Sequence, residues 1–104
     1  MKELIIEYKE LLNTRLPVKY TYPVKYNHCF NRIILDWLFT DCWYNHLDRR
    51  KSAISQLDET QLKAVIYRMN QWLADQQLLI ADNKNSLFYR SKTAQAFDQN
   101  MVSI

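Results

Sequence analysis

The sequence predicts a mainly α-helical single domain in which three principal helices are accompanied by a minor β component. Three observations lead to this fold class. The chain has 104 residues, the length of one domain. Its residues are 48 % hydrophobic, enough to bury a core. Most of its apolar residues recur at helical spacing. We therefore expect one domain over 1–92, made of an N-terminal helix (1–16), an extended arm (17–26) and a core (27–92), followed by a loosely ordered tail (93–104).

The first predicted helix covers residues 2–13. Its apolar side chains form one stripe, at Leu4, Ile5, Tyr8, Leu11 and Leu12. Such a stripe is typical of a helix that packs on a core, although a partner-binding or dimerising helix has the same pattern. We expect the helix to end before Pro17, because the residue that precedes a proline avoids the α conformation.

The segment PVKYTYPVKY, residues 17–26, repeats Pro-Val-Lys-Tyr. Valine and tyrosine occupy alternate positions, which predicts a strand with one covered face. Pro23 cannot donate a ladder hydrogen bond, so the strand would lie at an edge. The alternative is a lysine and tyrosine surface that stacks and pairs with nucleic acid.

A long central helix is predicted from Asn27, its N-cap, to about Leu47, with apolar residues on nearly every side. A helical wheel gathers several polar and aromatic residues near one another, namely His28, Arg32, Asp36, Trp43 and His46. Arg32 and Asp36 stand four residues apart and can pair. The stripe is therefore either a structural ion pair or a shallow polar pocket beside Trp43.

A third helix is predicted to begin after Asp58, because Gln61 three residues later completes a capping box. It would run to about Gln76. The following apolar runs LLIA and LFYR flank the polar segment DNKNS, which predicts a hairpin with Asn83 or Asn85 in the turn. A helix end followed by a single arm is the alternative. Helix, edge strand, two helices and hairpin together match a winged-helix arrangement.

The composition excludes several kinds of active site. The chain contains no glycine, and phosphate-binding P-loops, dinucleotide fingerprints and nucleophile elbows all need it. Cys29 and Cys42 lack the spacing of a zinc motif, and no base-orienting group accompanies Cys42 and His46. We therefore expect no metal, no cofactor and no catalytic residues, and we regard an enzyme as less favoured than a binding module.

Three segments, HCFNRIILDWLFTDCW, SAISQLDETQLKAVI and NKNSLFYRSK, resemble a group of small bacterial proteins with a His-Cys-Phe-x-Arg-Ile motif. These proteins are sometimes labelled GCN5-related acetyltransferases, so the resemblance implies an acyltransferase-related protein. It covers residues 27–92. The matching positions are His28, Cys29, Phe30, Arg32, Ile33, Asp36, Trp43, Ala53, Leu57, Gln61, Leu62, Ser86, Leu87, Arg90 and Lys92. Ser52 stands where the pattern has proline.

From the residues themselves, we expect a small non-enzymatic module that binds nucleic acid or a nucleoprotein complex. The formal net charge is +3. The expected contacts are Lys19, Lys25, Arg49, Arg50, Lys51, Lys63, Arg68, Lys84, Arg90 and Lys92. The alternative is a protein-interaction or inhibitor domain that uses the first helix or the 17–26 edge, with a homodimer as one form. We interpret Cys29 and Cys42 as cytosolic thiols. The glutamates in the first helix exclude a secretory apolar segment, and no apolar run is long enough to span a bilayer, so we expect a cytoplasmic protein.

Overall fold

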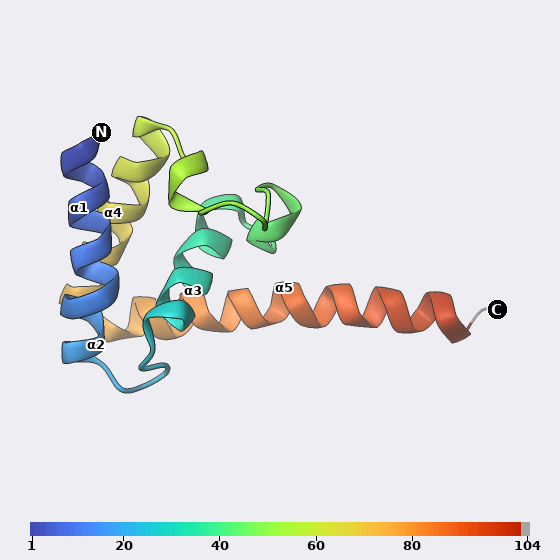
Figure 1. Ribbon diagram of the computed structural model, residues 1–104. Coiled ribbons are helices and arrows are strands. Elements are labelled where there is room, and N and C mark those ends of the chain that lie inside the picture. The colour runs from blue at the N-terminus through green and yellow to red at the C-terminus, as the bar shows by residue number, and fades with distance from the viewer. Residues whose placement is uncertain (103–104) are drawn as a thin grey trace.

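The computed structural model contains helices, turns and loops (Figure 1). It describes the backbone of residues 1–102 and the side chains of residues 1–92. The α-helices are α1 (Lys2–Glu10), α2 (Leu16–Lys19), α3 (Asn27–Phe39), α4 (Glu59–Ala74) and α5 (Gln76–Val102). A π-helical turn, η1 (Leu11–Arg15), joins α1 to α2, and two 3-10 turns, η2 (Trp43–Asn45) and η3 (Ile54–Gln56), lie between α3 and α4.

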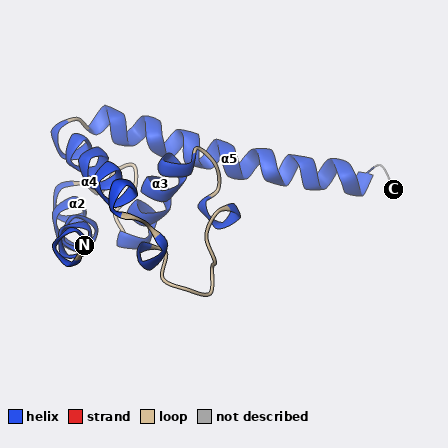
Figure 2. Cartoon of the chain, turned by 90° about the horizontal axis from the view of Figure 1, so that it is seen from above, coloured by secondary structure: helices blue, strands red, loops and turns tan. Residues whose placement is uncertain are grey.

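The helices are arranged as a small bundle crossed by α5. Helix α4 packs against α1, α3 and α5, and α3 also packs against α5 (Figure 1). Both views show α5 passing one end of the bundle and continuing beyond it (Figures 1 and 2). The loop of residues 40–58 leaves the end of α3 and returns to α4.

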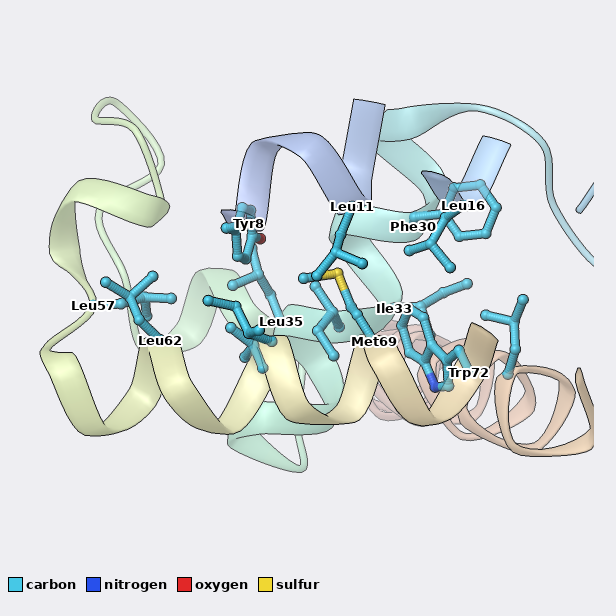
Figure 3. Close-up of a cluster of buried hydrophobic side chains, with 14 of the residues drawn as sticks. Tyr8, Leu11, Leu16, Phe30, Ile33, Leu35, Leu57, Leu62, Met69 and Trp72 are labelled. Atoms are coloured by element: carbon cyan, nitrogen blue, oxygen red, sulfur yellow. The ribbon is translucent and has the colours of Figure 1, made fainter. Parts of the chain in front are cut away.

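The core lies where the N-terminal segment, α3 and α4 meet (Figure 3). It is formed by side chains that are almost fully buried, among them Tyr8, Leu11, Leu16, Phe30, Ile33, Leu62, Met69 and Trp72. Burial of each large apolar side chain contributes about 1.5–3 kcal/mol, so this cluster is the main source of stability. The predicted apolar stripe of the first helix is therefore a core-packing face.

The predicted edge strand is wrong, because the described residues contain no strand. Pro17 does not end the helical path. It lies in the first turn of α2, where a missing N–H is tolerated. Residues 20–26 then form an irregular connection with a cis Tyr22–Pro23 peptide bond. The alternating residues of the predicted strand do not share a covered face, since Tyr20 is buried whereas Val18, in α2, is 81 % exposed.

The predicted hairpin is also wrong, since the whole segment belongs to α5. Leu79, Asp82 and Ser86 recur at intervals of three and four residues, and all are buried. Polar residues that resembled a turn are in fact hydrogen-bonded to neighbouring helices. With neither the strand nor the hairpin, the winged-helix arrangement is a wrong prediction too.

The central helix is shorter than predicted. It ends at Phe39, and Thr40 caps it in the left-handed conformation, with φ 49°. Its N-cap is Tyr26, so Asn27 is already its first helical residue. The capping box of Asp58 and Gln61 is confirmed by both reciprocal hydrogen bonds.

Helix α5 carries the described backbone to Val102. The loosely ordered tail expected for 93–104 falls on residues whose side chains lie outside the described part, and it stays a prediction. Among the helices described, none has the length and apolar character that crossing a membrane requires.

Candidate functional site

The carboxylate of Asp36, in α3, is completely buried and joins three parts of the chain. Its Oδ1 accepts a hydrogen bond of 2.9 Å from the backbone N–H of Trp43. Its Oδ2 accepts one of 2.5 Å from the Ser86 hydroxyl and is paired with the Arg90 guanidinium. Buried charge is costly unless it is paired and hydrogen-bonded, and these contacts satisfy it. Asp36 therefore fixes the loop after α3 and the middle of α5 together.

Arg32 reaches this carboxylate indirectly. Its guanidinium donates to the Ser86 hydroxyl oxygen at 2.6 Å and to Asn83 Oδ1 at 2.9 Å. The predicted pair of Arg32 with Asp36 is thus bridged by Ser86, while the direct ion pair is made by Arg90. We call Arg32, Asp36, Asn83, Ser86 and Arg90 the Asp36 cluster.

Two guanidinium groups share the single carboxylate of the Asp36 cluster. The pKa of Arg32 is lowered by its burial and further by the charge of Arg90, while Asp36 acts in the opposite direction. Arg90 remains 28 % exposed at its side chain. The cluster therefore carries an excess of positive charge toward the surface.

A second buried pair joins α4 to α5. Arg68 makes a two-pronged contact with Asp82, at 2.7 and 2.9 Å, and Trp72 donates its indole N–H to the same carboxylate at 2.7 Å. The hydrogen bond to Asp82 raises the pKa of Arg68. Arg68 also lies 5.4 Å from the ring centre of Trp37. This arginine is engaged within the fold and is not available as a surface contact.

An open groove of about 660 Å³ lies beside the Asp36 cluster, between the end of α3 and the middle of α5. We call it the aromatic groove. It is lined by Phe39, Thr40, Asp41, His46, Phe88, Tyr89 and Lys92. Phe39 and His46 are stacked, with ring centres 4.8 Å apart and planes at 2°. Phe88 is 61 % exposed.

Basic side chains meet at the ring of Tyr44, next to this groove. Arg49 lies 4.8 Å and Arg90 5.6 Å from its centre. Arg50 and Lys51 are exposed beside Arg49. Contacts of this kind are cation–π interactions, which hold the guanidinium groups in place. The loop after α3 and helix α5 thus contribute cations to the same place.

The predicted polar pocket is only partly assembled. Arg32, Asp36 and the backbone of Trp43 come together as described. His46 instead lies in the aromatic groove, with Nε2 3.2 Å from Asp41 Oδ2. His28 stacks on Tyr26, with ring centres 5.7 Å apart, near the start of α3. The helical wheel misplaced His46 because the helix is not continuous beyond Phe39, whereas His28 lies in the first turn of α3, eight residues before Asp36.

The predicted basic contacts differ in their environments. Lys25, Lys51, Lys84 and Lys92 are exposed, and Arg50 and Lys63 form surface pairs with Asp48 and Glu59. Lys19 donates to the Leu73 carbonyl. The structure therefore brings Arg49 and Arg90 together at Tyr44, with Arg50 and Lys51 next to Arg49 in the chain, and it places Lys92 on the aromatic groove. Neither Cys29 nor Cys42 forms a disulfide bond in the described part of the chain.

Sequence reasoning missed the roles of Tyr44, Asn83, Phe88 and Tyr89. A hairpin over residues 83–89 would not place Asn83, Phe88 and Tyr89 on one helix. The signal that could have indicated that helix is the spacing of positions 79, 82, 86 and 90, which fall on one helical face. No signal of this kind pointed to Tyr44.

A scan against models of known protein families found no match for this chain. Searches of curated proteins and of solved structures also found none.

Proposed function

We propose that this protein is a small non-enzymatic module that binds nucleic acid, free or within a nucleoprotein complex. The binding surface would be the loop of residues 44–51 together with the adjacent face of α5. The observation that carries the proposal is the convergence of Arg49 and Arg90 on the Tyr44 ring.

The convergence favours an anionic ligand. Like charges held close together repel one another, and a phosphate backbone relieves that repulsion while releasing its counterions. Arg49, Arg50 and Lys51 are exposed, so they can reach phosphates without disturbing the core. Arg90 is oriented by Asp36 and adds to the positive potential.

The arrangement of the Asp36 cluster supports a scaffold role for its polar groups. Every buried polar side-chain atom of the described residues has a hydrogen-bond partner. A network that is satisfied in this way rigidifies the surface that it supports. We therefore assign binding to the exposed cations and positioning to the Asp36 cluster.

The test is a titration of labelled DNA and RNA with the protein at two salt concentrations. We expect affinity to fall steeply with salt. The double variant Arg49→Ala/Lys51→Ala should flatten the log–log slope by roughly 0.7–0.9 for each phosphate that the protein no longer neutralises. The matched control is Lys2→Ala/Arg15→Ala, which removes the same charge from exposed positions of the N-terminal helical segment.

The control should change affinity and slope much less than the loop variant. Absence of binding at low salt would contradict the proposal. Equal effects of the two double variants would show that net charge alone, and not the Tyr44 region, determines binding.

A further inference from the structure

One side of the aromatic groove is formed by two aromatic rings whose orientation is already fixed. Phe39 and His46 are parallel within 2°, and their ring centres are 4.8 Å apart. Asp41 holds the pair in place, because its Oδ2 lies 3.2 Å from His46 Nε2 and accepts a hydrogen bond from the Asn45 amide at 3.3 Å. A planar ligand would therefore meet aromatic surfaces that are already oriented.

The opposite wall exposes an aromatic residue that the core does not use. Phe88 is 61 % exposed and lies next to Tyr89 on α5, with ring centres 6.4 Å apart. Exposed apolar surface in a concave site is typical of a ligand contact. Helix α5 thus presents an aromatic side chain to the space that faces the Phe39–His46 stack.

The charges around the groove distinguish a base from a phosphate. Asp41 lies in the groove, and its pKa is lowered chiefly by a backbone hydrogen bond from Cys42 and by the side chain of Asn45. A carboxylate repels phosphate but accepts hydrogen bonds from base amino groups. Lys92 also lines the groove, and Arg49 lies on the neighbouring Tyr44 ring. These cations suit the phosphates of the strand that carries an inserted base.

We propose that the aromatic groove receives an unpaired base, so that the protein binds single-stranded nucleic acid in preference to duplex. This inference rests on the proposed nucleic-acid function and specifies its substrate class. In a duplex both faces of each base are covered by its neighbours, so only an unstacked base can lie against Phe88 or the Phe39–His46 pair.

The test compares a labelled single strand with a duplex of the same sequence by fluorescence anisotropy. We expect the wild-type protein to bind the single strand more tightly. Phe88→Ala should weaken single-strand binding on the order of tenfold, as loss of one stacked base does, and leave duplex binding unchanged. Phe88→Trp should retain the affinity.

Leu87→Ala is the matched control, because Leu87 is the neighbouring residue, is 52 % exposed and does not line the groove. Circular dichroism checks that each variant is folded. A second measurement uses the only two histidines of the chain. The ring-proton signals of His46 should shift when the single strand is added, whereas those of His28, outside the groove, should not.

The outcomes separate the two proposals. If single strand and duplex bind equally and Phe88→Ala has no effect, the inference is overturned while the proposed function stands. An unshifted His46 signal at saturating single strand would also overturn it. If neither the single strand nor the duplex binds, both proposals fail, and a protein becomes the ligand to test for the groove.

Discussion

Asp36 and Asp48 each pair with an arginine, but their surroundings differ greatly. Asp36 is fully buried and accepts further hydrogen bonds from Ser86 and Trp43, whereas the side chain of Arg50, the partner of Asp48, is 90 % exposed. Solvent screens an exposed pair, while a buried carboxylate that loses its partner stays without compensation. Both are Asp–Arg ion pairs, so removing the arginine from each one tests how much burial changes the loss of stability.

We predict that Arg90→Ala lowers the free energy of unfolding by about 3 kcal/mol or more, because it leaves the Asp36 charge buried and unpaired. Arg50→Ala should leave it unchanged within error. Urea unfolding followed by circular dichroism measures both. Similar losses in the two variants would show that burial of Asp36 does not determine the cost.

Tyr8 provides a test with pH. Burial raises the pKa of its hydroxyl well above the ordinary value, and burial also raises that of Tyr20. The folded state therefore retains a proton that the unfolded state loses above pH 10 or so. The stabilisation that these buried hydroxyls contribute is fully present below that pH. The free energy of unfolding should fall by about 1.4 kcal/mol per pH unit for each such group as the pH rises further.

In Tyr8→Phe this alkaline loss of stability should be shallower, although the variant also removes the hydrogen bond to Asn31. Tyr67→Phe, at a ring that is 68 % exposed, is the control and should keep the wild-type slope. Unfolding measured at several pH values above neutrality gives both slopes. An unchanged slope in Tyr8→Phe would contradict the assignment.

At the scale of the helices, the end of α3 has an unusual cap. Thr40 adopts φ 49°, a left-handed conformation that glycine normally provides and that costs a β-branched residue about 1–2 kcal/mol. The chain contains no glycine to use there. The loop beyond Thr40 secures the turn, since the Trp43 N–H donates to Asp36 at 2.9 Å.

We predict that Thr40→Gly stabilises the protein by roughly 0.5–1 kcal/mol, because relief of the left-handed strain exceeds the greater flexibility of glycine in the unfolded chain. Thr60→Gly, in the first turn of α4, should instead destabilise it by roughly 0.5–1 kcal/mol. Thermal unfolding of the two variants provides the comparison. A loss of stability in Thr40→Gly would mean that the Thr40 side chain matters more than its backbone.

The elements differ in how well local sequence predicts them. Helix α4 was predictable because its cap and its apolar face both lie within one segment, from Asp58 to Trp72. Helix α5 was not predicted, because Asp82, Asn83 and Ser86 resemble turn residues in the sequence. Their helical positions make sense only with their hydrogen-bond partners, which are Arg68, Arg32 and Asp36 respectively. These partners lie 14 to 51 residues away.

The candidate site was predictable to a similar degree. Arg32 and Asp36 were singled out as a polar pair on an apolar helix, and they do share one network, through Ser86. The aromatic groove could not be predicted, since Phe39 and His46 stack only because the chain turns back after Thr40. Long-range contacts determine such sites, and periodicity does not report them.

At the scale of the whole molecule, α5 is held to the bundle over its first half. Its buried residues within the described side chains, Leu79, Asp82 and Ser86, precede Arg90. The named residues of the Asp36 cluster and of the Arg68–Asp82 pair all lie within residues 1–92. The folding unit should therefore not need the remainder of the chain.

We predict that a chain shortened to residues 1–92 unfolds at the same temperature as the full chain, within about 2 °C, and with the same cooperativity. Differential scanning calorimetry measures both quantities. A drop of several degrees would show that residues 93–104 contribute to the fold, and would place the domain boundary later than predicted.

The passage of α5 beyond the bundle has a hydrodynamic consequence. The radius of gyration of the Cα atoms is 14.8 Å, whereas a compact domain of this length has about 13 Å. The principal extents of 50 × 28 × 19 Å describe an elongated particle. A monomer of this shape diffuses slowly for its 12.6 kDa mass and elutes early from a sizing column. Its elution volume alone would therefore overestimate its mass, and light scattering is the measurement that distinguishes one chain from two.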